Sequence, residues 1–266
     1  MKTEESLVRD NEQFSSFLDK DILVIKEKQP ISSFARDIVD IFHLYDYMEH
    51  ALSSKAYKSL VLFSRSEPDL PIEYDGFLSK IFSGKQDPFY LDRFLNVANR
   101  FILSLAALDR MTVFAGQGTL SVLSLTTALA YDYRIVADNT VFENPDLDFG
   151  LVTKGSGYFL PRLLGILKAT EMLQWRSFTA EDALQLGLVD QIVPVSRLEA
   201  ETLEFVSKNQ SLLSTTLVSL RKLFKCDIKE LKRSLELEDS LIKERLISEE
   251  LRRRFAAERE SQGRLL

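Results

Sequence analysis

Two short aliphatic runs enclose one helical pattern near the start of the chain. The runs are Asp21–Lys26 and Ser59–Phe63, and residues 34–52 between them carry apolar side chains at spacings of three and four. A strand, a helix and a second strand in this order pair in parallel through a right-handed crossover. The pattern therefore predicts an α/β fold built on a parallel sheet.

The same alternation continues along the chain. Further strands are predicted at Met111–Ala115, Asp132–Ala137 and Leu188–Val193, and helices at Leu91–Leu108 and Ser121–Ala130. Proline and glycine interrupt residues 64–88, which predicts a long loop with one short helix around Phe77–Phe82. After Leu198 the strand signals stop, and a helical pattern runs to about Glu260. We therefore expect a core at residues 1–197 and a helical oligomerisation region at residues 198–266.

Composition excludes several classes of function. The 34 Lys and Arg residues against 40 Asp and Glu residues give a net charge of −6, which repels the phosphates of nucleic acids. One cysteine, Cys226, and two histidines are too few for the usual zinc site. No apolar run reaches the roughly 20 residues that a membrane helix needs, and the acidic amino terminus lacks a secretion signal. We expect a cytoplasmic protein that binds neither nucleic acid nor membranes.

Two nucleotide motifs and one hydrolase motif are incomplete. Gly116-Gln117-Gly118 precedes a predicted helix, but position 121 is serine where the dinucleotide fingerprint needs a third glycine. The chain has no phosphate-binding Gly-Lys-Ser/Thr sequence and no Gly-x-Ser-x-Gly elbow. These absences argue against dinucleotide binding, nucleotide hydrolysis and serine-hydrolase chemistry.

The segment from Gly116 to Asp146 can nevertheless support chemistry at an anionic oxygen. A helix that begins directly after a tight turn offers backbone N–H groups without intrahelical partners, and its dipole favours a negative charge. Asp146 follows Pro145, and such a rigidly held carboxylate suits proton transfer. The alternative is an aspartate that only forms a turn.

Four segments of this block resemble the crotonase (enoyl-CoA hydratase/isomerase) superfamily. They are similar to the family's "cDyriAad" strand, its "F..Pe..lGl" segment, its "lprliG" turn and its "ysAeeAlelGLVd" helix. In this sequence the four segments are Ala130–Asp138, Phe142–Leu151, Leu160–Gly165 and Phe178–Asp190. The segment Leu251–Arg259 is similar to the family's terminal "aF.ekR" helix. The chain is thus identified as a divergent member of the superfamily.

The resemblance implies a fold, a ligand and a reaction. The fold is a crotonase-like spiral of ββα turns with a helical C-terminal trimerisation region. The ligand is an acyl-CoA thioester, with coenzyme A as part of the substrate and no other cofactor. The chemistry is enolate stabilisation, in which two backbone N–H groups bind the thioester oxygen while carboxylates move protons.

The sequence departs from the family pattern at the positions that carry this chemistry. The family's Gly-Gly-Gly is Val122-Leu123-Ser124 here, so the second oxyanion donor is expected to be the N–H of Leu123. Thr126 stands where the first catalytic glutamate is expected, and we expect it to take part in substrate binding rather than in proton transfer. Asp146 stands where the second glutamate is expected. The first oxyanion donor falls on Pro68 or on Glu73, depending on the alignment.

These departures favour isomerisation over hydration. Hydration in this family uses two carboxylates to orient one water, whereas one carboxylate, Asp146, is enough to carry a proton between two carbons. The alternative is a weakened relative that binds an acyl-CoA or a protein partner without turnover.

The resemblance also favours a homotrimer or a dimer of trimers, and an apolar stripe supplies a surface for it. The stripe comprises Leu241, Ile242, Leu246, Ile247 and Leu251. Packing of this stripe onto its own core is the alternative.

Overall fold

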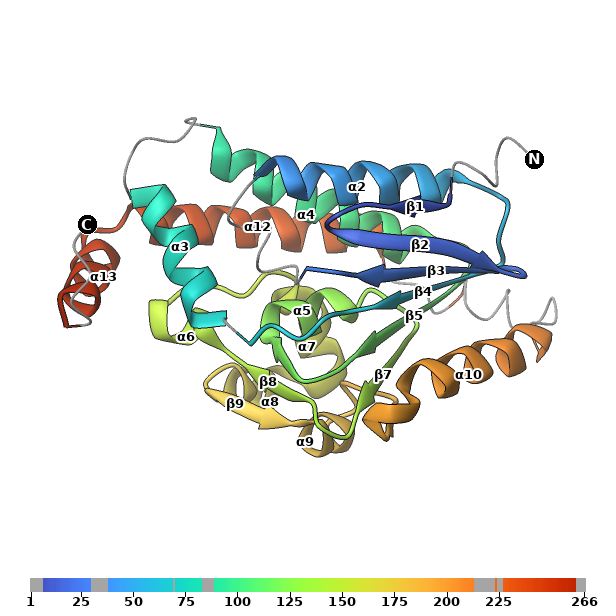
Figure 1. Ribbon diagram of the computed structural model, residues 1–266. Helices are drawn as coiled ribbons and strands as arrows, with labels where there is room; N and C mark the ends of the chain where they lie inside the picture. Colours follow the sequence, from blue (N-terminus) through green and yellow to red (C-terminus); the bar gives the residue numbers. More distant parts are fainter. Residues whose placement is uncertain are drawn as a thin grey trace.

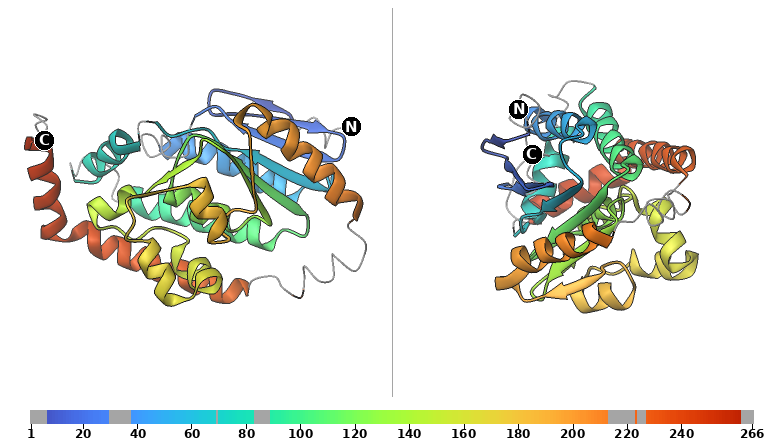
Figure 2. Two further views of the ribbon diagram at one scale, coloured as in Figure 1. Left: turned by 90° about the horizontal axis from the view of Figure 1, so that it is seen from below. Right: turned by 90° about the vertical axis from the view of Figure 1, so that its right-hand side faces the viewer.

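The computed structural model describes residues 7–29, 38–68, 70–82, 89–212, 223 and 227–261. Cys226 and Asp69 lie outside these residues, and of residues 38–45 only the backbone is described. Within these ranges a seven-stranded sheet forms the centre of the molecule and a three-stranded sheet lies beside it (Figure 1). Helices cover both faces of the larger sheet (Figure 2).

The larger sheet contains the predicted parallel ladder. In spatial order its strands are β1 (Arg9–Asp10), β2 (Phe14–Asp19), β3 (Ile22–Glu27), β4 (Ser59–Phe63), β5 (Met111–Gly116), β7 (Tyr133–Ala137) and β10 (Gln191–Val193). The pairs from β3 to β10 are parallel, and β1 and β2 are antiparallel additions at one edge. The smaller sheet consists of β6 (Thr119–Ser121), β8 (Val141–Glu143) and β9 (Ser177–Thr179).

The parallel strands are apolar on both faces because each face is buried under helices. Leu23 of β3 and Leu60 of β4 belong to the larger apolar core, together with α2 (Ile38–Ser53), α4 (Tyr90–Ala107) and α12 (Ile228–Ile247). Their neighbours Val24 and Val61 belong to a second core under α10 (Leu198–Leu212). The alternation of these neighbours fixes the register of the sheet.

Five shorter helices lie between strands of the two sheets. They are α5 (Val122–Ala128), α6 (Pro145–Phe149), α7 (Ser156–Leu164), α8 (Ile166–Met172) and α9 (Ala180–Gln185). The Thr179 side chain accepts the N–H of Asp182, and the Asp182 carboxylate accepts the N–H of Thr179, which together make a capping box for α9. Among these helices α5 contacts β6, β8 and α7, and α6 contacts α3 and α13.

The segment after β4 is more helical than the sequence suggests. Residues 70–82 form one helix, α3 (Leu70–Phe82), where a loop with a short helix is expected. Pro71 is compatible with this helix because it lies in the first turn, where a missing N–H costs no hydrogen bond. The helix buries Leu70, Tyr74 and Leu78 at spacings of four.

The C-terminal region is helical as expected, and it packs on the rest of the chain. Leu231 and Leu235 of α12 are part of the larger core, and α12 contacts α4 and α7. The last helix, α13 (Glu249–Ser261), lies beside α3 and α6 at one end of the molecule (Figure 1). The boundary between residues 197 and 198 stays a prediction.

A substitution at Phe142 tests how much the packing of the small sheet contributes to stability. Its side chain is fully buried, and its ring packs on Phe178 with 5.2 Å between ring centroids. We expect Phe142→Ala to lower the free energy of unfolding in urea by about 3–5 kcal/mol, because it leaves a cavity. The matched control is Val141→Ala in the same strand, where the side chain is 36% exposed. An equal loss in both variants would contradict this account.

Candidate active site

A turn, a short strand and a capping serine lead into α5. Gly118 has a positive φ of 66° and lies in the turn between β5 and β6, and Ser121, the last residue of β6, caps α5 by accepting the N–H of Ser124 at 3.0 Å. Leu123 is half-buried in the first turn of α5, where backbone N–H groups have no intrahelical acceptor. Its role as an oxyanion donor stays a prediction.

A carboxylate of the same chain reaches this helix start. Glu67 is buried, and its Oε1 accepts hydrogen bonds from the Ser121 N–H at 3.1 Å, the Ser121 hydroxyl at 3.3 Å and the Ser124 hydroxyl at 2.6 Å. A negative charge at this end of a helix is favourable. No sequence pattern indicated this contact, because Glu67 lies more than fifty residues before α5 in a segment expected to be a loop.

One of the two candidates for the first oxyanion donor lacks the N–H group that the role requires. Pro68 is exposed and has no N–H, so it cannot be the donor. The N–H of Glu67 donates to the Thr119 carbonyl at 2.7 Å. The other candidate, Glu73, is buried in the first turn of α3, and its role stays a prediction.

The Asp146 side chain is buried and makes two polar contacts. It is in the first turn of α6, and its carboxylate accepts hydrogen bonds from the Thr153 and Tyr74 side chains. Burial raises the pKa of Asp146 above its ordinary value, and the two hydrogen bonds partly offset this rise. A carboxyl group with a raised pKa is better suited to exchanging a proton near neutral pH than an exposed aspartate.

Tyr74 connects the two acidic groups of the region. Burial first, and then the charges of Asp146 and Glu67, hold the pKa of the Tyr74 phenol well above 10, so it stays protonated and donates to Asp146. Its ring stacks on Phe149, at the end of α6, with 6.2 Å between centroids. The spacing of Leu70, Tyr74 and Leu78 is the signal that could have found this residue in the sequence.

The Thr126 hydroxyl contacts three backbone carbonyl groups. Thr126 is fully buried, and its Oγ1 lies 3.0 Å from the Val122 carbonyl, 3.1 Å from the Leu123 carbonyl and 2.6 Å from the Lys154 carbonyl. The last contact joins α5 to the segment before α7. Its predicted role in substrate binding is not tested by these contacts and stays a prediction.

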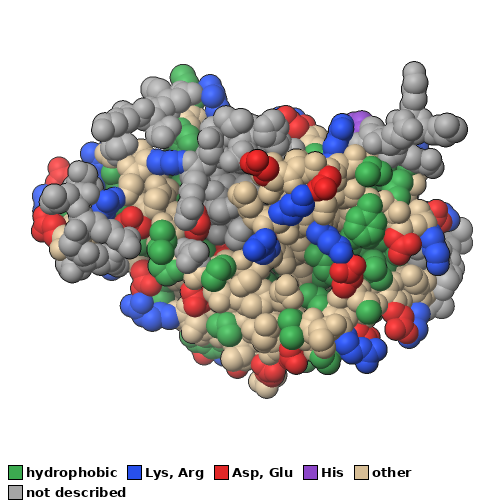
Figure 3. Space-filling model, in the orientation of Figure 1, with side chains coloured by type: hydrophobic (Ala, Val, Ile, Leu, Met, Phe, Trp, Pro, Cys, Tyr) green, Lys and Arg blue, Asp and Glu red, His purple; other side chains and the backbone are tan. Residues whose placement is uncertain are grey.

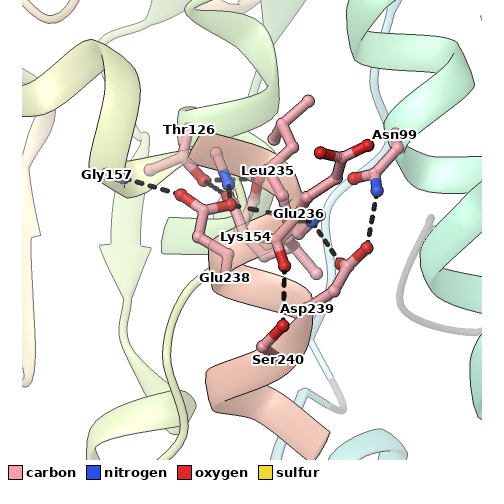
Figure 4. Close-up of polar contacts among 11 residues, drawn as sticks. Asn99, Thr126, Lys154, Gly157, Leu235, Glu236, Glu238, Asp239 and Ser240 are labelled. Carbon is pink, nitrogen blue, oxygen red and sulfur yellow. Dashed lines mark hydrogen bonds and ion pairs between the residues drawn. The ribbon is translucent and has the colours of Figure 1, made fainter. Parts of the chain in front are cut away.

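Behind this segment lies a cluster of buried charges, shown in Figure 4. The Lys154 ammonium group donates to the Leu235 carbonyl at 2.7 Å and pairs with Asp239 on α12. The Glu238 carboxylate accepts the N–H groups of Gly155 at 2.8 Å and Gly157 at 2.7 Å. Sequence reasoning missed this cluster, because its members lie more than eighty residues apart.

Two other kinds of site were sought among the residues that the structure describes. Among the described residues, no group of three or more His, Cys, Asp or Glu side chains could hold a metal ion. No helix of the described chain is long and apolar enough to cross a bilayer. On the face shown in Figure 3, basic and acidic side chains are interspersed.

Comparison with known proteins gives one matching family. The family model described as enoyl-CoA hydratase/isomerase matches residues 105–261, which is more than half of the chain. The "Probable enoyl-CoA hydratase echA17" of Mycobacterium avium is 41% identical over 92 residues, which are 34% of this chain and 36% of that protein. The fatty acid oxidation complex subunit alpha of Pseudomonas syringae is 33% identical over 113 residues, which are 42% of this chain and 16% of that protein. These alignments thus span about a third or less of the relatives' lengths.

Solved structures confirm the expected fold over nearly the whole chain. The crystal structure of enoyl-CoA hydratase from Bacillus halodurans matches with a TM-score of 0.77 and 23% identity, covering 92% of this chain and 99% of that one. The structure of Pseudomonas aeruginosa OdaA matches with a TM-score of 0.71 and 20% identity, covering 93% and 98%. The predicted crotonase-like α/β fold with C-terminal helices is therefore correct.

Glu27 makes the stability of this region pH-dependent. It ends β3, and its Oε2 accepts the Ser64 hydroxyl at 2.9 Å and the Arg65 N–H at 3.2 Å. Burial above all, together with the nearby Glu67 charge, raises the pKa of Glu27 from 4.5 to about 8.

A carboxyl group with a raised pKa stabilises the fold while it is protonated. This contribution is complete below pH 4.5 and is lost as the pH rises to about 8. Relative to Glu27→Gln, we expect the wild-type free energy of unfolding to fall by on the order of 4 kcal/mol across this window. Urea unfolding at a series of pH values measures this free energy for both proteins. Parallel curves of unfolding free energy against pH would contradict the prediction.

Proposed function

The chain belongs to the enoyl-CoA hydratase/isomerase family, and from this premise we propose that it acts on an acyl- or enoyl-CoA by stabilising the enolate of the thioester. The reaction we propose is double-bond isomerisation with one carboxylate. Asp146 removes a proton from the α-carbon of a 3-enoyl thioester and returns it to the γ-carbon as the double bond moves. No redox partner is needed, and coenzyme A enters as part of the substrate.

The observation that carries this proposal is the environment of Asp146. The carboxyl group is buried, its pKa is raised by that burial, and it is held by two neutral hydrogen-bond donors, Tyr74 and Thr153. A group that has to accept and then release a proton works best when its pKa is near the working pH. Thr126 stands at the position of the other carboxylate, and its hydroxyl does not act as an acid or a base near neutral pH. This supports isomerisation rather than hydration.

The enolate oxygen is the second part of the proposal. We place it at the N–H of Leu123, in the first turn of α5. Loss of one such backbone donor costs about 10²–10³ in rate in enzymes that use them. The half-buried Leu123 side chain narrows the space beside the thioester relative to the glycine of the family pattern.

A second candidate function is supported by Glu67. Its carboxylate already accepts hydrogen bonds from Ser121 and Ser124 at the start of α5, and a like charge there opposes the formation of an enolate oxygen. This contact favours a protein that binds an acyl-CoA or a protein partner without turnover.

Deuterium exchange tests both candidates. The protein is incubated with a 3-enoyl-CoA in D₂O, and deuterium in the acyl chain is measured by mass spectrometry. The isomerase proposal predicts exchange. Measurable binding of the CoA ester without exchange would contradict it and support the second candidate.

Asp146→Asn is the decisive variant for the catalytic group. We expect it to lower exchange by at least about 10²-fold, since the amide cannot carry the proton, with little change in affinity for the thioester. Asp148→Asn is the matched control, because Asp148 lies in the same helix but pairs with Arg176 at the surface. Exchange that survives in the Asp146 variant would remove its assigned role.

We also propose self-association as a homotrimer or a dimer of trimers in the cytoplasm. Ile242, Leu246 and Leu251 of the predicted stripe are buried within the chain, whereas Leu241 and Ile247 are exposed. Leu163, Ile166 and Leu167 around the start of α8 add exposed apolar surface, 51%, 74% and 88% exposed. Exposed apolar side chains of this size support an interface between chains.

Sedimentation velocity at micromolar concentration checks the assembly. We expect species of three or six chains, because the exposed apolar side chains would be covered between copies. A single species with the mass of one chain would contradict the proposal.

A further inference from the structure

Three charged side chains behind the candidate site are buried, unlike those of an ordinary surface ion pair. The side chains of Lys154, Glu238 and Asp239 are 5%, 4% and 14% exposed, and the Lys154 nitrogen lies 3.8 Å from Glu238 and 2.5 Å from Asp239. Asn99 of α4 donates to the other Asp239 oxygen at 2.6 Å (Figure 4). A buried group of this kind rarely stabilises a fold more than apolar side chains of the same volume would. A contribution to the geometry of the site is therefore the better explanation.

The cluster holds one short segment of backbone from several sides. Glu238 binds the N–H groups of Gly155 and Gly157, and the ammonium group of Lys154 is anchored on α12. A Cβ atom on Gly157 would lie 3.0 Å from Glu238 Oε1, so the glycine permits this close approach. The carbonyl of Lys154 accepts the Thr126 hydroxyl, which joins the same segment to α5.

The residue next to Lys154 is Thr153, whose side chain donates to Asp146. The position of this donor depends on the backbone of residues 153–157, and α12 fixes that backbone. We propose that Lys154, Glu238 and Asp239 are positioning residues, which hold Thr153 against Asp146 and so couple the C-terminal helix to the proton-carrying group. The role rests on the proposed function of Asp146, but the contact itself is measurable without turnover.

Lys154→Met tests the proposal, with Lys154→Arg as the rescue. Loss of the ammonium group loosens Thr153, and the Asp146 carboxylate loses a donor. The other groups that act on Asp146, Tyr74 directly and Glu67 through Tyr74, are unchanged. We expect the Asp146 titration midpoint to rise by about one pH unit in Lys154→Met and to return toward wild type in Lys154→Arg. Carbon-13 NMR of carboxyl-labelled aspartate measures it, and Asp146→Asn identifies the signal.

Kinetics gives the second readout. In the exchange assay we expect kcat to fall about tenfold or more in Lys154→Met with KM nearly unchanged, because the group is misplaced while the thioester still binds. Arg162→Met is the matched control. Arg162 of α7 also pairs with α12, through Glu230 at 2.5 Å, but both side chains are exposed. We expect neither the midpoint nor kcat to change in this control.

An Asp146 midpoint that is the same in wild type and in folded Lys154→Met overturns the proposal, as does an equal effect of Arg162→Met. If Lys154→Met does not fold, Glu238→Gln is measured instead, since its amide oxygen can hold only one of the two glycine N–H groups. If the wild type shows no exchange, the proposed function fails, while a shifted midpoint in the variant still supports the positioning role.

Discussion

The parallel pairing of β3, β4, β5 and β7 is the constraint on which the other features depend. Parallel strands are stable here because helices bury both faces, and their carboxyl ends meet at one edge of the sheet. Glu27 is the last residue of β3, Ser64 directly follows β4, and the turn at Gly118 follows β5. The ladder therefore brings together Glu27, the segment after β4 and the turn that leads to α5, although they are distant in the sequence.

Local patterns in the sequence were enough to predict the parallel strands, but not the other elements that surround the candidate site. The strand at Ser59–Phe63 and the helix near Leu91 are periodic and apolar, so they were predicted nearly to the residue. The hairpin strand Phe14–Asp19 was missed, because its stabilisation comes from pairing with β3 rather than from its own composition. The helix at Leu70–Phe82 was underestimated, because proline and glycine were weighed as breakers although Pro71 lies where a helix accepts it.

The candidate site shows the same division between local and distant information. The family resemblance singled out Leu123, Thr126 and Asp146, of which the first two lie in α5 and the third lies in the first turn of α6. The side chains around them come from elsewhere. Tyr74 of α3 donates to Asp146, Glu67 of the preceding loop accepts hydrogen bonds at the start of α5, and Glu238 of α12 holds the backbone of Gly155 and Gly157. Such contacts depend on tertiary packing, which one sequence without its relatives does not reveal.

The buried acid at the end of β3 also changes how much charge the folded chain carries. The formal net charge of −6 counts every Glu side chain as ionised. With its pKa near 8, Glu27 is mostly neutral at pH 7 in the folded protein and ionised in the unfolded chain, so folding takes up close to one proton. The heat of folding at neutral pH therefore includes the heat of ionisation of the buffer that supplies this proton, and it differs between phosphate and an amine buffer.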